Sequence, residues 1–244
     1  MDFNTGSSGG RPDDESRPLY GGEGGGTTGG PPRGPAGSPG GEFSLQDPVG
    51  SFVRTVQGVL RSPVAFFRGL ARQGDFINPA VFALICALIS ALLGGILSLI
   101  FTPLFAGPGD TGEAFAGGIA GFVISLILTP IYAAIALLVV SGVFHLLALL
   151  FVRPSNAGFE ATFRVVSYSW VYQLISWIPV IGWIAGPIYG IVLSIFGIRE
   201  VHNTTTGKAA AIVLIPVVVV LLLVLILVAL IGAALFFGTQ QQQF

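Results

Sequence analysis

The sequence predicts an all-α protein, a polytopic transmembrane helical bundle of five spans with its N-terminus cytosolic and its C-terminus outside. The chain is almost continuously apolar between Pro79 and Phe237. The charged residues of this region lie in three short breaks that separate runs long enough to cross a bilayer: Asp110, Glu113, Arg153, Glu160, Arg164, Arg199, Glu200 and Lys208. A charge at the bilayer centre costs at least about 2.5–3.5 kcal/mol on insertion scales, so this distribution is typical of a helical membrane protein.

Composition supports the same class. The hydrophobic fraction is 52% and the charged fraction 9%, whereas soluble proteins carry about 25% charged residues. The mean hydropathy is +0.83. A formal net charge of −1 gives no basis for binding nucleic acid. Cys86 is the only cysteine, and the chain has no HExxH motif, no CxxC and no phosphate-binding glycine loop before a helix, so we expect no catalytic residues, no metal site and no cofactor.

Residues 1–46 are expected to form a disordered, Gly/Pro-rich cytosolic tail. Their central part is built mostly from Gly, Pro, Thr and Ser, and such a segment buries too little apolar surface to offset the entropy of ordering it. Two interpretations of the tail stay open. It is either a passive extension or a tether that recruits partners.

Residues 47–72 are expected to form amphipathic helices that lie in the membrane interface. Apolar residues recur there at helical spacing, at Val49, Phe52, Val53, Val56, Val59 and Leu60. The four arginines of this segment follow at intervals of seven and then four residues, so they form one stripe beside the apolar face, Arg54, Arg61, Arg68 and Arg72. Ser62 and Pro63 are typical of an N-cap and a first-turn proline and divide the region into two helices. The stripe predicts contact with an anionic membrane surface; the alternative is a helix that packs on cytosolic loops.

Residues 73–244 are expected to form the membrane domain. Its spans are predicted at about 79–104, 114–152, 163–178, 181–198 and 209–237. The second is read as one long, kinked helix, broken near Thr129 and Pro130, that projects beyond the bilayer, because about 40 residues of helix extend well past the hydrocarbon core. The stretch Ile178–Gly182 predicts a tight hairpin between the third and fourth spans.

The distribution of basic residues predicts the orientation of these spans. Four arginines precede the first span, and the loops after the second and fourth spans carry Arg153, Arg164, Arg199 and Lys208. The loops after the first and third spans and the segment after the fifth carry no Lys or Arg. Because basic loops stay in the cytosol, only a cytosolic N-terminus and an external C-terminus place every basic residue on one side.

Small residues repeat every four positions along the fourth predicted span, at Gly182, Gly186, Gly190 and Ser194. Small residues at this spacing let helix backbones approach closely. Three interpretations stay open: packing within the monomer, a homo-oligomer seam, or a proline-broken helix that lines a ligand site.

His145 is expected about two turns from the cytosolic end of the second span, with Ser141 one turn earlier on the same face. An ionisable residue inside a membrane raises a functional question. No acid and no oxyanion donor accompanies the pair, and neighbours on one helix rarely have attack geometry. A neutral histidine that makes hydrogen bonds inside the bundle is the simpler interpretation.

Several short stretches resemble the Yip1 family of five-span membrane proteins, in particular its bacterial branch. The matching stretches are Arg61-Ser62-Pro63 with Phe66-Phe67, Phe159 with Thr162-Phe163, Tyr168-Ser169, Ile178-Pro179-Val180-Ile181-Gly182, Gly197-Ile198-Arg199-Glu200-Val201-His202 and Thr206-Gly207-Lys208-Ala209. Their order and spacing carry the resemblance over about residues 55–237. The resemblance implies a multi-pass protein of a bacterial inner or plasma membrane, and it brings no catalytic residues. Eukaryotic relatives are associated with membrane trafficking and with binding of small lipidated GTPases.

The first functional hypothesis is a non-enzymatic integral membrane protein that organises the membrane or recruits partners at the cytosolic face. Its expected partners are the lipid bilayer, a further copy of the chain or another membrane protein. The runner-up is a small transporter or permease component with a site at the proline-broken helices. A transporter requires polar groups that converge at mid-membrane. The candidates inside the spans are Ser125, Thr129, Ser141, His145, Tyr168, Ser169 and Tyr172.

Overall fold

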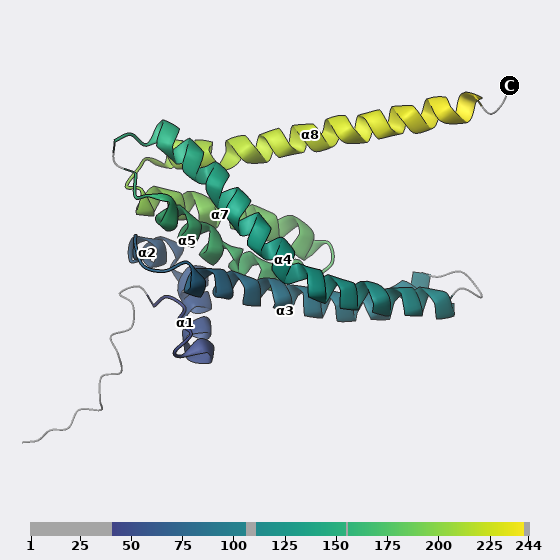
Figure 1. Cartoon of the computed structure of the whole chain (residues 1–244), viewed down its shortest axis with the longest axis horizontal. Helices are drawn as coiled ribbons and strands as arrows, with labels where there is room; N and C mark the ends of the chain where they lie inside the picture. Colours follow the sequence, from purple (N-terminus) through teal and green to yellow (C-terminus); the bar gives the residue numbers. More distant parts are fainter. Residues whose placement is uncertain (1–40, 106–110, 155, 242–244) are drawn as a thin grey trace, which may run out of the picture. The chain divides into compact units, whose positions relative to one another are not determined.

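The computed structural model describes residues 41–105, 111–154 and 156–241, and these form helices with no strand among them (Figure 1). The predicted all-α class is confirmed. The elements are α1 Pro48–Arg61, α2 Pro63–Arg68, α3 Ile77–Phe101, the 3-10 turn η1 Thr102–Phe105, α4 Thr111–Phe151, α5 Phe159–Ser169, the 3-10 turn η2 Trp170–Tyr172, α6 Gln173–Ser176, α7 Ile181–Val201 and α8 Thr206–Gln241.

Four of these helices are long and apolar enough to cross a membrane: α3, α4 over Phe115–Phe151, α7, and α8 over Thr206–Ala234. Their outward faces expose large apolar side chains along most of their length. In water such surface would be very unfavourable, whereas in lipid it is the expected state. The chain is therefore a multi-pass integral membrane protein.

The third predicted span, 163–178, differs from the other four. The chain there is divided into α5, η2 and α6, and none of the three is a spanning helix by length. All of α5 from Ala161 to Ser169 is buried, because it packs against α3, α4 and α7. The third predicted span is therefore an interrupted run at the centre of the bundle, and five spans with the stated orientation remain a prediction.

The second predicted span is one helix, α4, close to its expected bounds of 114–152. The predicted single long helix is therefore present, and it continues through Pro130, so the expected break near Thr129 and Pro130 does not interrupt it. Hydroxyl groups supply extra donors in this turn: Thr129 donates to the Ser125 carbonyl at 2.7 Å, and Ser125 donates to the Phe122 carbonyl at 2.7 Å. Both bonds lie within α4, and neither goes to the Leu126 carbonyl, which lacks an N–H donor because of Pro130. Figure 1 shows α4 changing direction along its length.

A cluster of buried aromatic side chains lies where α2, α3 and α5 meet. Phe66 and Phe67 of α2, Phe82 of α3 and Tyr168 of α5 are all buried. The Tyr168 ring lies 5.3 Å from that of Phe66 and 5.2 Å from that of Phe82, measured between centroids. Aromatic pairs at this separation contribute about 0.5–1.5 kcal/mol beyond their burial. This aromatic cluster joins the segment before the membrane domain to its centre.

The small residues of α7 are buried within the monomer. A Cβ atom added at Gly182 would lie 2.1 Å from the carbonyl oxygen of Ile175, and one at Gly190 would lie 2.6 Å from the ring of Tyr172. Gly186 and Ser194 are also buried. The small residues thus let α7 approach η2 and α6 closely. The expected hairpin before α7 is present, and the Ile181 N–H donates to the Pro179 carbonyl at 2.7 Å.

Replacing Gly182 by valine is expected to destabilise the monomer by about 1–3 kcal/mol, because the new side chain meets backbone atoms that cannot move aside. The matched control is Gly232→Val in α8, where a Cβ atom has no neighbour within 4 Å. Thermal unfolding in detergent measures the difference. A Gly182→Val protein with normal stability but an altered oligomeric state would favour the homo-oligomer seam instead.

Candidate functional site at the α1 end of the bundle

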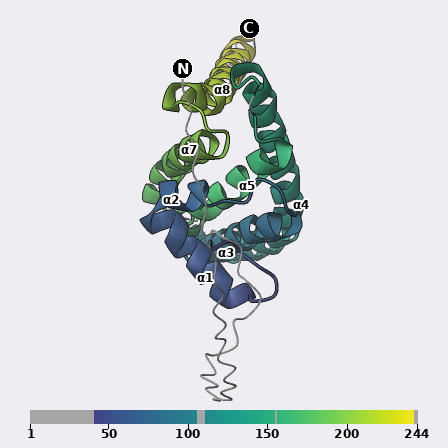
Figure 2. The ribbon, with the colours of Figure 1, turned by 90° about the vertical axis from the view of Figure 1, so that its left-hand side faces the viewer.

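Helix α1 runs across the direction of α3 and lies at one end of the bundle, together with α2 and the turns that follow α4 and α7 (Figures 1 and 2). We call this the α1 end. Every basic residue in the described ranges belongs to an element at this end: Arg54, Arg61, Arg68, Arg72, Arg153, Arg164, Arg199 and Lys208. The positive charge of the described domain is therefore concentrated on one side.

The four arginines of the predicted stripe do not share one environment. Arg54 forms an exposed ion pair with Asp47 at 2.7 Å. Arg68 pairs with Glu200 of α7 at 2.9 Å. With the Asn203 amide oriented to suit its neighbours, its oxygen accepts a hydrogen bond from Arg72 at 2.6 Å. Arg68 and Arg72 thus contact the end of α7, but all four arginines are exposed, and Arg54 and Arg61 are the two that α1 carries.

Only part of the apolar face of α1 is buried in the protein. Its buried residues are Ser51, Thr55 and Val59. Val49 is 77% exposed, and Val53 and Leu60 are 47% and 49% exposed. Val49, Val53 and Leu60 are spaced four and then seven residues apart, so they form one apolar stripe on the outward face of the helix. An apolar stripe next to arginines is the arrangement that favours lying in a membrane interface.

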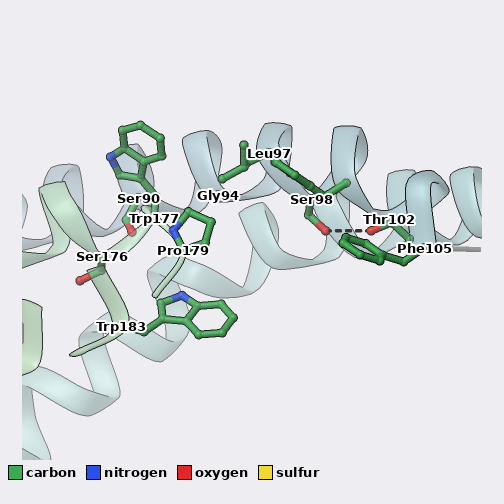
Figure 3. Close-up of a pocket in the computed structure, with 11 residues that line it drawn as sticks. Ser90, Gly94, Leu97, Ser98, Thr102, Phe105, Ser176, Trp177, Pro179 and Trp183 are labelled. Carbon is green, nitrogen blue, oxygen red and sulfur yellow. Dashed lines mark hydrogen bonds between the residues drawn. The ribbon is translucent and has the colours of Figure 1, made fainter. Parts of the chain in front are cut away.

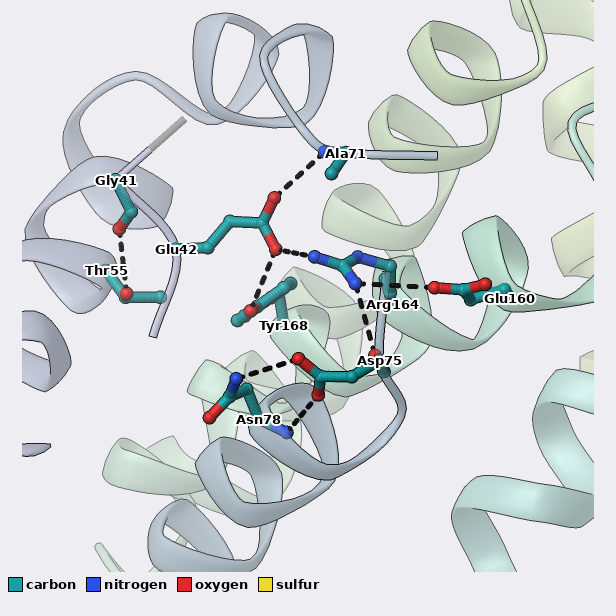
Figure 4. Close-up of polar contacts among 9 residues, drawn as sticks. All are labelled: Gly41, Glu42, Thr55, Ala71, Asp75, Asn78, Glu160, Arg164 and Tyr168. Atoms are coloured by element: carbon teal, nitrogen blue, oxygen red, sulfur yellow. Dashed lines mark hydrogen bonds and ion pairs between the residues drawn. The ribbon is translucent and has the colours of Figure 1, made fainter. Parts of the chain in front are cut away.

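Residues 41–46, which we call the strap, run from the edge of the described chain to the N-cap of α1. Figure 4 shows the Glu42 side chain pointing between three donors. The Ala71 N–H donates to one carboxylate oxygen at 2.9 Å, and the Tyr168 hydroxyl donates to the other at 3.2 Å. The Arg164 guanidinium forms a buried ion pair with the same carboxylate. We call these three donors the carboxylate cradle.

The backbone of the strap is also bound. The Thr55 hydroxyl donates to the Gly41 carbonyl at 3.0 Å. The Ser44 N–H donates to the Ser51 hydroxyl at 2.9 Å, and that hydroxyl donates back to the Ser44 carbonyl at 3.1 Å. The Leu45 N–H donates to the side-chain oxygen of Asn78 at 3.0 Å. Gly41 has φ +69, a conformation that glycine adopts without strain.

Phe43 of the strap lies in the core. It is 2% exposed, and its ring centroid is 6.1 Å from that of Phe82. The sequence places the tail boundary at residue 46, whereas Glu42 and Phe43 are buried in the described fold. The remaining residues of the expected tail, 1–40, lie outside the described residues. The only signal for the strap was an acid beside an aromatic residue at the end of a glycine-rich stretch, and sequence alone could not supply its partners.

Arg164 completes the site from α5. Besides the strap carboxylate, it donates to the Asp75 carbonyl at 3.1 Å and lies 3.6 Å from a carboxylate oxygen of Glu160. Glu160 and Arg164, four residues apart on α5, are thus part of a buried network, since Arg164 is only 5% exposed. The Arg164 Nε atom and one Glu160 oxygen are buried without a hydrogen-bond partner among the described residues. A buried guanidinium needs anionic partners, and the strap brings the nearest one.

Two histidines meet through Thr162 at the same end. The Ala157 N–H donates to Nδ1 of His202 at 3.0 Å, so the proton of the neutral ring is on Nε2, 3.0 Å from the Thr162 hydroxyl. That hydroxyl lies 3.5 Å from Nδ1 of His145. Burial, with smaller contributions from His145 and Arg72, lowers the pKa of His202 from 6.5 to about 4. His202 is therefore neutral at pH 7 and contributes to packing.

A cavity of about 980 Å³ lies between α3, η1 and the turn before α7 (Figure 3). Figure 3 shows Pro179 between Trp177 and Trp183, across from Ser98 and Thr102. The lining residues are glycine, apolar or hydroxyl-bearing: Ser90, Gly94, Leu97, Ser98, Phe101, Thr102, Phe105, Ser176, Trp177, Pro179 and Trp183. None of the seven polar candidates for a transport site lines this cavity.

The polar candidates inside the helices are scattered. Ser125 and Thr129 bond to the backbone of their own helix. Tyr168 belongs to the carboxylate cradle, whereas Ser141 and Ser169 are buried without a hydrogen-bond partner among the described residues. The described residues contain no group of three His, Cys, Asp or Glu side chains arranged to hold a metal ion. The α1 end can therefore bind an anionic group through the carboxylate cradle, and it can contact a membrane surface through the outward face of α1.

A family model described as the Yip1 domain matches residues 58–241. The match begins within α1 and ends at the last residue of α8, so it includes Ala71, Arg164 and Tyr168 of the cradle and leaves the strap outside. No curated protein and no solved structure matches the chain.

Proposed function

Because the chain belongs to the Yip1 family, we propose that it acts without catalysis, by organising the membrane or recruiting partners at the cytosolic face. The α1 end is the functional face in this proposal. The observation that supports it is the position of helix α1, which lies across the direction of α3. Its exposed side chains Val49, Val53 and Leu60 lie beside Arg54 and Arg61. A helix with this pattern binds a membrane surface through buried apolar area and attraction to anionic lipid.

We infer that the α1 end faces the cytosol and that the chain crosses the bilayer five times. The concentration of basic residues at this end supports the orientation, because the positive-inside rule keeps such loops in the cytosol. The interrupted run α5–η2–α6 is the third crossing in this arrangement. The burial of α5 and of Trp170 and Val171 in η2 fits a segment that is largely shielded from lipid by its neighbours.

Labelling of single cysteines is expected to report this topology. With Cys86 replaced, a cysteine at Gly112 should react with an impermeant maleimide added outside intact cells, and one at Gly207 should react only after lysis. The two positions are matched, since both glycines lie in the first turn of a long helix, and an added Cβ atom has no neighbour within 4 Å at either. External labelling at Gly207 would overturn the five-span arrangement.

Helix α1 is expected to insert its apolar stripe into the interface. A fluorophore on Val53→Cys should be quenched by bromine-labelled lipid tails in nanodiscs that contain anionic lipid, and high salt should reduce the quenching. The double change Arg54→Glu/Arg61→Glu should reduce it further, because each arginine near an anionic leaflet contributes about 1 kcal/mol.

The control for this experiment reverses two other basic residues at the same end, Arg153→Glu/Lys208→Glu, which lie outside α1. Quenching should then stay close to that of the unchanged protein. Quenching that depends on neither salt nor the α1 arginines would mean that the apolar stripe acts alone and that the arginines serve only as a topology signal. A label that is never quenched would refute the interfacial position of α1.

The runner-up function, a transporter or permease component, has one observation in its favour. The cavity beside Pro179 lies at a proline-interrupted hairpin and is large enough for a small ligand. Its walls carry only hydroxyls as polar side-chain groups apart from the two indoles, and the other polar residues of the spans are scattered. Transport of a polar solute needs convergent polar groups, so the organising role is the better supported of the two.

A further inference from the structure

The strap is held in the way that a protein holds a bound peptide. We call the surface that contacts it, made by the carboxylate cradle, Phe82 and the side chains that bind its backbone, the groove. The carboxylate of Glu42 receives three donors, and the ring of Phe43 fills an aromatic site next to Phe82. The backbone on either side is bound by side chains of the surrounding helices, Thr55, Ser51 and Asn78. Main-chain bonds combined with pockets for particular side chains are the general means of peptide recognition.

The groove requires an anionic group. Arg164 is 5% exposed, and without the strap its remaining carboxylate neighbour in the described fold would be Glu160, at 3.6 Å. Removing the closer anionic partner of a buried guanidinium is unfavourable, so an emptied cradle is disfavoured. The strap is therefore released more readily by exchange with another carboxylate than by simple opening.

The groove also distinguishes a peptide from a simple anion. Phe43 is 2% exposed beside the carboxylate, and the hydrogen bonds to the Gly41 carbonyl and the Ser44 and Leu45 backbone extend the contact along several residues. A phosphate or a lipid headgroup would satisfy Arg164 but leave the aromatic site and these donors and acceptors unused. The recognised unit is an acidic residue followed by an aromatic one.

The carboxylate cradle and the strap belong to different parts of the chain. The three cradle donors and Phe82 lie inside the family match of residues 58–241, whereas Glu42 and Phe43 precede it. The cradle thus belongs to the family domain, whereas the strap and the two α1 residues that bind its backbone, Ser51 and Thr55, precede the match.

We propose that this groove is a binding site for an acidic–aromatic peptide segment of a partner protein, and that Glu42 and Phe43 occupy it in cis. The inference rests on the proposed recruiting function and names the class of partner. The strap then acts as an internal competitor. A tethered segment has an effective concentration on the order of millimolar, so an identical partner segment binds poorly until the strap is weakened or outcompeted.

The test uses the full chain in nanodiscs of neutral lipid and a fluorescent peptide with the sequence of residues 40–47. A strap-weakened variant, Glu42→Gln/Phe43→Ala, should bind this peptide at least ten-fold more tightly than the unchanged protein, and the peptide should raise its melting temperature. Peptides that carry Glu42→Gln or Phe43→Ala should each bind at least ten-fold more weakly. Equal binding of the acidic and the amide peptides would overturn the proposal.

Two further measurements test the proposal. If the strap-weakened variant does not fold, Ser44→Cys in a Cys86→Ala background serves as the reporter, and excess acidic peptide should speed its reaction with a thiol reagent whereas the amide peptide should not. The second arm adds inorganic phosphate or anionic lipid. Displacement of the peptide by either at its ordinary concentration would show a general anion site and overturn peptide recognition. Neither failure would alter quenching of the Val53 label, which tests the membrane contact of α1 separately.

Discussion

Replacing Arg164 by methionine is expected to destabilise the protein by about 3–5 kcal/mol, because the Glu42 carboxylate would stay buried without its cation. The reverse change, Glu42→Met, should cost a similar amount by stranding the guanidinium. Thermal or denaturant unfolding of the full chain in detergent measures both. The effect is large because both side chains are nearly inaccessible to solvent and cannot recover hydration in place.

The double variant Glu42→Met/Arg164→Met separates the pair from its surroundings. Since both charges are removed together, it should be more stable than either single variant, with a coupling of at least about 1 kcal/mol. The matched control is Arg54→Met, the same substitution in the exposed pair with Asp47, whose side chains are 61% and 54% exposed. Exposed pairs contribute about 0–1 kcal/mol, so this change should be almost silent. Equal losses at Arg54 and Arg164 would contradict the buried network.

Acid is expected to destabilise the protein through His202. The folded-state pKa is about 4 and the unfolded-state value is 6.5, so between these values the unfolded chain binds more protons and stability falls as pH falls. One pKa unit corresponds to 1.36 kcal/mol, so the total loss from this group is roughly 3 kcal/mol. Most of it should be present at pH 4, and it should be complete about one pH unit lower, where both states are protonated.

The variant His202→Asn isolates this contribution. Its amide oxygen can still accept from the Ala157 N–H, but it cannot be protonated in this range. Melting temperatures measured between pH 7 and pH 4 should therefore fall less steeply for His202→Asn than for the unchanged protein. Parallel slopes in the two proteins would mean that His202 is solvated or already charged in the folded state.

Much of the fold followed from local properties of the sequence. Apolar runs with charges confined to their ends predicted α3, α4, α7 and α8 within a few residues, because the cost of burying a charge in lipid acts on each segment separately. The hairpin Ile178–Gly182 and the division of the first region at Ser62 are likewise local turn signals. Three of the small residues singled out on α7, Gly182, Gly186 and Gly190, lie against the run from Tyr172 to Ser176.

The site depended on contacts between distant segments. The spacing of the four arginines predicted one stripe, yet two of them pair with the end of α7, more than a hundred residues away in the chain. The third predicted span reads as an apolar run, but whether such a run crosses lipid as one helix or is broken and enclosed depends on the helices around it. Periodicity describes one element and carries no information about its neighbours.

By itself, the sequence determined the membrane class, the helical content, the main spanning segments and the family. These follow from hydropathy, charge placement and short motifs, each of which acts over a few residues. Only the tertiary structure decided that Glu42 and Phe43 belong to the domain and that Arg164 is buried with them. The stability of a buried ion pair depends on the removal of water by several segments at once, and those segments come together only in the folded chain.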